Sequence, residues 1–159
     1  RGLWKVCDPY FRFWYAAVRP SMSELDAGDA EGVWRHAIRP RMNDLLSDSF
    51  EDECRQWVRR RNADGGLPFR YESMGRWWHG SEEIDVVAIG KGKAHLLGEC
   101  KFRNAPVGVD VLKDLRDKES RWFKKGPGWL WLFSKNGFQD GNWAEGDTIR
   151  LVQPEELEE

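Results

Sequence analysis

Charged residues inside two neighbouring apolar segments could together perform phosphodiester chemistry. The segment EEIDVVAIG carries Asp85, and the segment AHLLGECKF carries Glu99 and Lys101. Charged groups among Val, Ile and Leu are costly to bury unless they are paired or bind a metal ion. Two carboxylates and a nearby backbone carbonyl, that of Cys100, suit Mg²⁺ or Mn²⁺, while a lysine can orient water and stabilise charge on a phosphate.

The alternation of side chains along a strand decides whether these groups can meet. Glu99 and Lys101 are two residues apart and therefore share a face, and Asp85 shares a face with Val87. We expect pairing across a hairpin, with GKGK as its turn, to bring Asp85 beside Glu99, although the register is an assumption. The alternative is an exposed hairpin face whose Asp, Glu and Lys form surface pairs of little consequence.

The elements that must position these residues follow from hydrophobic periodicity. Apolar residues at helical spacing over 33–62 predict two helices with a break near 47–49, and the segment 108–125 predicts an amphipathic helix that ends at Gly126 and Pro127. The predicted strands are 67–78, 83–90, 94–102, 128–134 and 148–153. The order predicts an α/β or α+β sandwich with a mixed sheet.

Composition sets the class of protein. A chain of 159 residues suffices for one main domain, and a formal net charge of -2 with 33% charged residues does not by itself require a nucleic-acid partner. Cys7, Cys54 and Cys100 each lie in an apolar run, which favours buried reduced thiols in a cytoplasmic protein. No run approaches the ~20 apolar residues of a membrane span. The three histidines lack metal-ligand spacing.

The beginning of the chain differs from the rest in composition. Residues 1–20 are rich in aromatic side chains, residues 21–32 are small and acidic like a linker, and a main domain is expected over 33–159. Because the chain starts at Arg1 in mid-pattern, we expect a piece of a longer protein. A helix over 9–18 should dock on the core through Phe11, Trp14, Tyr15 and Val18. The edge around Leu3, Trp4 and Val6 should stay partly unpaired and favour a homodimer.

Two levels of resemblance extend this interpretation. The segments EIDVVAIG and LLGECKF resemble the active-site hairpin of the PD-(D/E)XK nuclease superfamily, with an acid on one strand and E-x-K on the next. More narrowly, five motifs in order resemble the C-terminal region of the DEXX-box archaeal-type ATPases, which also occur in bacteria. The motifs are DPYFRFWYAAVRP, FEDECRQWV, EIDVVAI, GECKF and LWLFSKNGF, and they span nearly the whole chain.

The resemblance implies a restriction-endonuclease-like core of the Holliday-junction-resolvase type, with a mixed central sheet flanked by helices and an N-terminal helical extension. It also implies DNA as the substrate, and a P-loop ATPase domain and a winged-helix region upstream in the parent protein. This sequence lacks G-x-x-x-x-G-K-[ST], so no ATP site is expected within it.

The same resemblance assigns roles to residues. It implies that Asp85, Glu99 and the carbonyl of Cys100 hold Mg²⁺ or Mn²⁺ and that Lys101 is catalytic. The proline that precedes the acid in the superfamily is Ile84 here, a variation that leaves the metal ligand in place.

The family pattern also has an acidic residue on the first core helix, and Glu51 in FEDEC matches it. The helical wheel alone does not choose, because Glu51 and Glu53 lie on opposite borders of the apolar stripe, each roughly 80° from its centre. Glu53 therefore stays an alternative.

Basic clusters interleaved with aromatic residues could contact the phosphates of DNA, and a solvated helix face is the other explanation. The residues concerned are Arg59, Arg60, Arg61, Arg103, Lys124 and Lys125.

Three hypotheses for the function follow from the sequence: a Mg²⁺-dependent DNA endonuclease domain, a non-catalytic DNA-binding or regulatory module of the ATPase, and a protein-interaction domain. The complete Asp85, Glu99 and Lys101 set favours the first.

Overall fold

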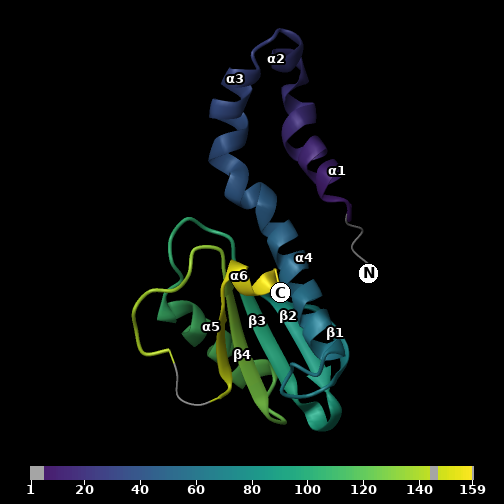
Figure 1. Ribbon diagram of the computed structural model, residues 1–159, viewed down its shortest axis with the longest axis vertical. Coiled ribbons are helices and arrows are strands. Elements are labelled where there is room, and N and C mark those ends of the chain that lie inside the picture. The colour runs from purple at the N-terminus through teal and green to yellow at the C-terminus, as the bar shows by residue number, and fades with distance from the viewer. Residues whose placement is uncertain (1–5, 144–146, 159) are drawn as a thin grey trace. The chain divides into compact units, whose positions relative to one another are not determined.

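The computed structural model describes residues 6–143 and 147–158 (Figure 1). The chain divides into two compact units between Ser49 and Phe50. Within the described residues, none of the helices combines the length and the apolar composition needed to cross a membrane.

A five-stranded mixed sheet forms the centre of the second unit (Figure 1). Its strands are β1 (Tyr71–His79), β2 (Glu82–Gly90), β3 (His95–Lys101), β4 (Gly128–Ser134) and β5 (Ile149–Val152), in that spatial order. Strands β1, β2 and β3 pair antiparallel, whereas β3, β4 and β5 pair parallel. All five predicted strands are present, and the predicted turn joins β2 to β3 through the short helical segment Lys91–Lys93.

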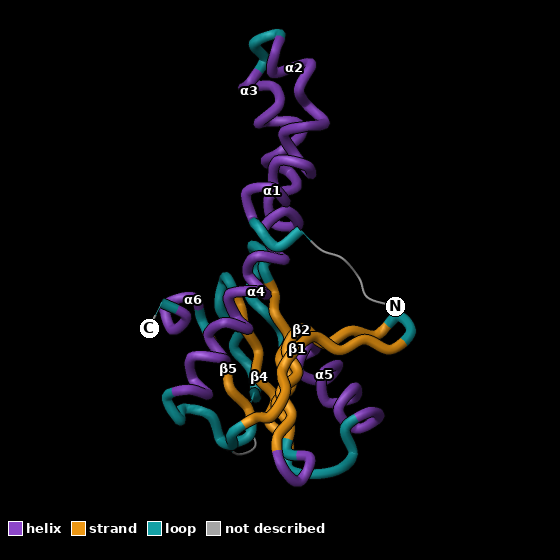
Figure 2. The backbone as a smooth tube through the Cα atoms, turned by 90° about the vertical axis from the view of Figure 1, so that its right-hand side faces the viewer, coloured by secondary structure: helices purple, strands orange, loops and turns teal. Residues whose placement is uncertain are grey.

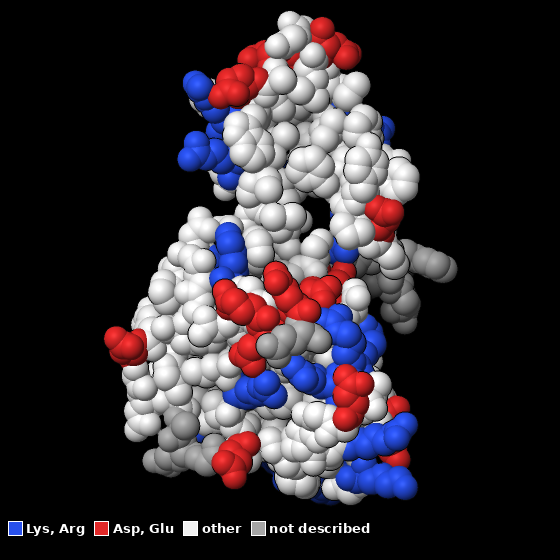
Figure 3. All heavy atoms as spheres, viewed as in Figure 1, with Lys and Arg blue, Asp and Glu red and all other residues white. Residues whose placement is uncertain are grey.

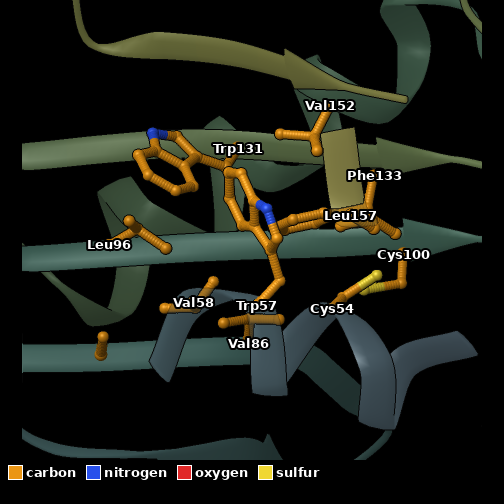
Figure 4. Close-up of a cluster of buried hydrophobic side chains, with 11 residues drawn as sticks. Cys54, Trp57, Val58, Val86, Leu96, Cys100, Trp131, Phe133, Val152 and Leu157 are labelled. Carbon is orange, nitrogen blue, oxygen red and sulfur yellow. The ribbon is translucent and has the colours of Figure 1, made fainter. Parts of the chain in front are cut away.

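Helices cover both faces of this sheet and bury two apolar clusters. On one face, Cys54, Trp57 and Val58 of α4 (Met42–Ala63) pack on residues that include Leu96 and Phe133 (Figure 4). On the other face, α5 (Val109–Trp122) buries Val111, Leu112 and Leu115 against the strands. The short helix α6 (Pro154–Leu157) adds Leu157 to the first cluster. The predicted mixed α/β fold with helices flanking a central sheet is confirmed.

The pairing of β1 with β2 contains an extra residue on β2. Gly75 lies opposite Val87, whereas Trp77 lies opposite Ile84, so two steps along β1 match three along β2. Ile84 consequently joins Val87 in the cluster beneath α5, which simple alternation forbids. Such bulges bend a strand pair and re-aim side chains. Figure 2 shows the β1–β2 hairpin turning out of the plane of the sheet at its free end.

Three sequence-based details are wrong. Helix α4 runs unbroken through 47–49, and the interruption falls instead at Pro40, which lacks the N–H that a helix interior needs. Helix α6 escapes prediction, because four residues show no period. Cys54 and Cys100 are buried, with their sulfur atoms side by side in Figure 4, but Cys7 is exposed.

The first unit is a hairpin of irregular helices. Its elements are α1 (Pro9–Phe13), a π-helical turn (Trp14–Val18), a 3-10 turn (Arg19–Ser21), α2 (Met22–Asp26), α3 (Ala30–Val33), a second π-helical turn (Trp34–Ile38) and a second 3-10 turn (Arg39–Arg41), after which α4 begins. The helical segment predicted over 9–18 is confirmed, and Asp8 caps it by accepting from the N–H groups of Tyr10 and Phe11. The stretch 21–32 is mostly helical.

The predicted docking stripe is incorrect, because Phe11 and Tyr15 are about half exposed, at 51% and 54%. The core of the first unit is built instead around Ala17, Val33 and Ile38. Leu3 and Trp4, part of the expected unpaired edge, lie outside the described residues.

An internal repeat explains the two similar halves of this hairpin. The pattern W-x-x-A-[VI]-R-P-x-M-x-[DE]-L occurs at 14–25 and again at 34–45. In both copies the arginine before proline donates its N–H five residues back, to Trp14 in the first and Trp34 in the second. The wider π-helical turn accommodates a proline that cannot donate in an ordinary helix.

Candidate active site

The predicted site residues of β2 and β3 come together at the carboxyl end of β3. The paired register of these strands ends with Val86 opposite Gly98, which leaves Asp85 next to Glu99. Asp85 Oδ2 accepts a 2.8 Å hydrogen bond from the backbone N–H of Cys100. Lys101 Nζ lies 2.7 Å from Glu99 Oε1. Two carboxylates and an ammonium group thus converge where the bulge of β2 meets the end of β3.

Asp85 is held in an environment that disfavours its charge. The residue is only 8% exposed. Burial, reinforced by the nearby Glu99 carboxylate, raises the pKa of Asp85 to about 6, against the opposing influence of the Cys100 N–H and Lys101. At neutral pH, Asp85 therefore carries a negative charge that both its burial and the Glu99 carboxylate disfavour. A cation placed between the two would relieve this repulsion.

Lysine side chains reach Glu99 from two elements. Lys101 approaches one carboxylate oxygen from β3, and Lys118 of α5 lies 3.4 Å from the other, while also donating to the carbonyl of Glu83 at 2.8 Å. Burial alone would lower the pKa of Lys101, but the Glu99 carboxylate outweighs it, so that the pKa lies above the ordinary lysine value. Lys101 is therefore a stable ammonium group beside the two acids.

Glu51 reaches the same region from α4, through arginines. Its carboxylate forms ion pairs with Arg76 and, at 3.7 Å, with Arg55. Arg55 Nη1 in turn donates to the backbone carbonyl of Asp85 at 2.8 Å. The alternative, Glu53, contacts Arg60 instead. The geometry thus connects Glu51, and not Glu53, to the Asp85 segment.

The donor set fits a hard divalent cation. Asp85 and Glu99 offer carboxylate oxygens on adjacent strands, and the Cys100 carbonyl lies between Glu99 and Lys101 in the chain. Oxygen ligands of this kind suit Mg²⁺ and Mn²⁺. Among the described residues, no group of three His, Cys, Asp or Glu side chains is placed to hold a metal ion, so backbone oxygen, water or substrate would have to complete the coordination.

The basic residues predicted to contact DNA are scattered. Arg59 is exposed, but Arg60 bonds Glu53 and the Leu157 carbonyl, and Arg61 stacks on Trp57 with its guanidinium 5.0 Å from the ring centroid. Acidic and basic side chains are interspersed on the face of the second unit seen in Figure 3. The structure does not gather the arginine run of α4 into one continuous basic surface.

Arg103 and the lysine pair lie at different ends of β3. Arg103 follows the strand directly and donates to the carbonyl of Pro106 at 3.4 Å. Lys124 and Lys125 instead line a hollow with His95, the first residue of β3. Since a strand rises roughly 3.3 Å per residue, about 20 Å separates this hollow from the carboxyl end at Lys101.

Sequence reasoning misses Lys118, Arg55 and Arg76. A signal exists for Lys118, which lies three residues after Leu115 and seven after Val111, on the helix stripe that faces the sheet. Arg55 lies four residues after Glu51 on the same helix, which is a signal for that ion pair. Its contact with the Asp85 carbonyl, and the ion pair of Arg76 with Glu51, join distant elements and carry no such signal.

Comparisons with known proteins give a family but no activity. Residues 14–122 match the model of the DUF234 family, described as archaeal and bacterial proteins of unknown function. An uncharacterized protein of Methanocaldococcus jannaschii is 29% identical over 120 residues, which cover 74% of this chain and 26% of that protein. The chain thus matches about a quarter of that relative's length. No solved structure matches the chain.

Proposed function

We propose that this chain, which belongs to the DUF234 family of archaeal and bacterial proteins of unknown function, is a Mg²⁺-dependent DNA endonuclease domain of the PD-(D/E)XK superfamily. The observation that carries the proposal is the convergence of the buried Asp85 carboxylate and the partly buried Glu99 carboxylate with Lys101 at the end of β3. In the parent protein, the domain would follow a P-loop ATPase domain of the DEXX-box archaeal type.

Asp85, Glu99 and the Cys100 carbonyl would hold the cation. When bound, Mg²⁺ would supply Lewis-acid chemistry, polarising a phosphate and lowering the pKa of a water molecule. Its charge would also favour the ionised form of Asp85, whose pKa is raised by burial and by Glu99.

The lysines of the site have separate roles. Lys101, an ammonium group at 33% side-chain exposure, can reach a water molecule or a phosphate oxygen and stabilise negative charge that develops there. Lys118 is more buried and is held by the Glu83 carbonyl, so its role is to position the Glu99 carboxylate. Glu51, through Arg55, holds the backbone of Asp85.

Metal binding is the direct test of the site. Calorimetric titration with Mn²⁺ should show binding to the wild type that Asp85→Ala abolishes, because the variant loses one of two carboxylate ligands. Asp114→Ala, which removes an exposed carboxylate of α5, is the matched control and should bind as the wild type. Equal Mn²⁺ binding by wild type and Asp85→Ala would show that the site is misplaced.

A second function is favoured by a separate observation. Both oxygens of Glu99 already have lysine partners, and Glu51 has arginine partners, so these two carboxylates are neutralised by ion pairs that link α5 and α4 to the sheet. Such a network suits a non-catalytic module that binds DNA or regulates the ATPase. In that case the chain would bind DNA without cutting it.

A further inference from the structure

A hollow of about 510 Å³ lies at the end of the sheet opposite Lys101. It is lined by Ile89, Lys93, His95, Arg121, Trp122, Phe123, Lys124 and Lys125. Pockets for small ligands have volumes of about 300–1,000 Å³. Basic and aromatic side chains thus share one cavity large enough for a single nucleotide.

Two turns supply the lysines and are fixed against each other. Gly126 adopts a φ of +90°, and a Cβ atom there would lie 2.2 Å from the carbonyl oxygen of Lys93. Lys93 itself has a φ of 63°, a conformation that non-glycine residues seldom adopt. Strained residues of this kind cluster at functional sites, where the surroundings hold them. The packing brings Lys93 of one turn near Lys124 and Lys125 of the other.

A buried histidine holds this arrangement in place. His95 is 2% exposed, and its two ring nitrogens lie 3.1 Å from the Lys93 carbonyl and 2.9 Å from Glu119 Oε1. Burial alone would lower the pKa of His95, but the hydrogen bonds to Glu119 and to the Lys93 carbonyl outweigh it, so that the pKa lies above the ordinary histidine value. The Glu119 carboxylate is thus engaged by His95, and no ion pair joins it to Lys93, Lys124 or Lys125 among the described residues.

The three lysines keep their charge available. Arg121 is paired with Glu82 at 2.7 Å, but within the described part of the chain Lys93, Lys124 and Lys125 form no ion pair. The hollow therefore carries uncompensated positive charge at the solvent boundary, as a site for phosphate would.

Aromatic rings form one wall. Trp122 is 41% exposed, and its indole N–H donates to Glu82 at 2.6 Å, which orients the ring. Trp77 and His79 pack against it, with ring centroids 5.6 Å and 4.2 Å from that of Trp122, and Phe123 contacts both Trp77 and His95. A base can stack on an exposed ring fixed in this way, but only if it is not paired inside a duplex.

We propose that this hollow binds one nucleotide of a single nucleic-acid strand, with the base against Trp122 and the phosphates held by Lys93, Lys124 and Lys125. The inference deepens the proposed function, and its link to cleavage rests on that function. The DNA that is cut at the carboxyl end of β3 would also be held in this hollow, about 20 Å away, and the part of the DNA in the hollow would be unpaired.

The test measures binding without cleavage. Fluorescence anisotropy with a short labelled oligodeoxythymidylate in EDTA should show binding by the wild type and weakening of about fivefold or more in Trp122→Ala and in Lys124→Glu/Lys125→Glu. Trp122→Phe should retain most of the affinity because it keeps a ring. Lys113→Glu/Arg116→Glu, which reverses two exposed charges of the same helix, is the charge-matched control and should bind as the wild type.

Three results would overturn the inference: unchanged binding in the lysine pair variant, an equal loss in the control, or competition by free thymidine monophosphate as effective as by the oligonucleotide. If circular dichroism shows that Trp122→Ala does not fold, the binding of the Lys124→Glu/Lys125→Glu variant alone tests the inference, because both lysines are exposed. If the variants bind the oligonucleotide more weakly but the wild type never cuts DNA, this inference holds and the proposed function fails. If the wild type cuts DNA but the variants bind the oligonucleotide as the wild type does, the proposed function holds and this inference fails.

Discussion

Asp85 is buried at a cost that the surrounding protein does not offset. Its side chain accepts one hydrogen bond from β3, that of the Cys100 N–H, and Glu99 is the acidic group that raises its pKa most. Burial and that repulsion raise its pKa from 3.8 to about 6. A shift of roughly two pKa units corresponds to about 3 kcal/mol between the two protonation states. At neutral pH the residue therefore lowers the stability of the metal-free protein.

The pH dependence of stability should reveal this cost in EDTA. The folded protein binds the Asp85 proton more tightly than the unfolded chain, so the free energy of unfolding should fall as the pH rises from 4 through about 6. Asp85→Asn keeps an acceptor for the Cys100 N–H but carries no charge. It should be more stable than the wild type at alkaline pH, by up to about 3 kcal/mol, and similar to it at low pH.

Urea unfolding of both proteins across this range measures the difference, and Asp114→Asn, an exposed change, should leave the pH dependence as it is. A constant difference between Asp85→Asn and the wild type at every pH would contradict the origin of the effect in the Asp85 proton.

Strand and helix positions were largely predictable, whereas the bulge that sets the site was not. Apolar alternation and the GKGK turn predicted β2 and β3, and the helical stripe predicted α5. The extra residue of β2 depends on how Gly75 and Trp77 pair across the strands, which no local pattern encodes. The proximity of Asp85 and Glu99 was predictable from the hairpin of β2 and β3 alone. Lys118, Arg55 and Arg76 required the packing of helices on the sheet.

The repeat at 14–25 and 34–45 is present in the sequence itself, but local periodicity does not reveal it. When each copy is considered alone, residues 14–25 look like part of an aromatic segment, whereas residues 34–45 look like the start of a helix. Each copy carries Arg-Pro at the same place, and that proline sets the end of each π-helical turn.

Close packing of β3 between its neighbours should make Gly98 intolerant of a side chain. A Cβ atom there would lie 2.9 Å from Val86 Cβ and 3.0 Å from a ring carbon of Phe133, both buried. Gly98→Ala should therefore lower the free energy of unfolding by about 1–3 kcal/mol. Gly75→Ala is the matched control, because no atom lies within 4 Å of a Cβ atom at that position of β1. Equal urea midpoints for the two variants would contradict the close approach of β2 and β4 to β3 at Gly98.

At the scale of the molecule, the first unit presents apolar side chains that its own core does not use. Tyr10, Phe11 and Tyr15 are 64%, 51% and 54% exposed. Phe11 and Tyr15 line a hollow of about 610 Å³ in this unit, together with Arg12, Arg41 and Asp48. Exposed apolar groups in such numbers favour association.

We therefore predict that the chain forms a homodimer through the first unit. Sedimentation velocity should show a dimer for the wild type and a monomer for Phe11→Asp/Tyr15→Asp, because buried charge would oppose the interface. Ser120→Asp, an exposed change in α5, should remain dimeric. A wild type that is monomeric at every concentration, or a double variant that associates as the wild type does, would contradict this prediction.

The central claim is that Asp85, Glu99 and Lys101 hydrolyse DNA, and cleavage by Lys101→Met tests it most directly. Linear, branched and supercoiled DNA should each be incubated with Mg²⁺ or Mn²⁺ and either the wild type, Lys101→Met or the exposed control Lys113→Met. The wild type and the control should cut at least one substrate. Lys101→Met should bind Mn²⁺ as the wild type does but cut about 100-fold or more slowly, because methionine fills the space without an ammonium group. Cleavage by Lys101→Met at the wild-type rate, or no cleavage by the wild type of any substrate at high concentration, would contradict the account.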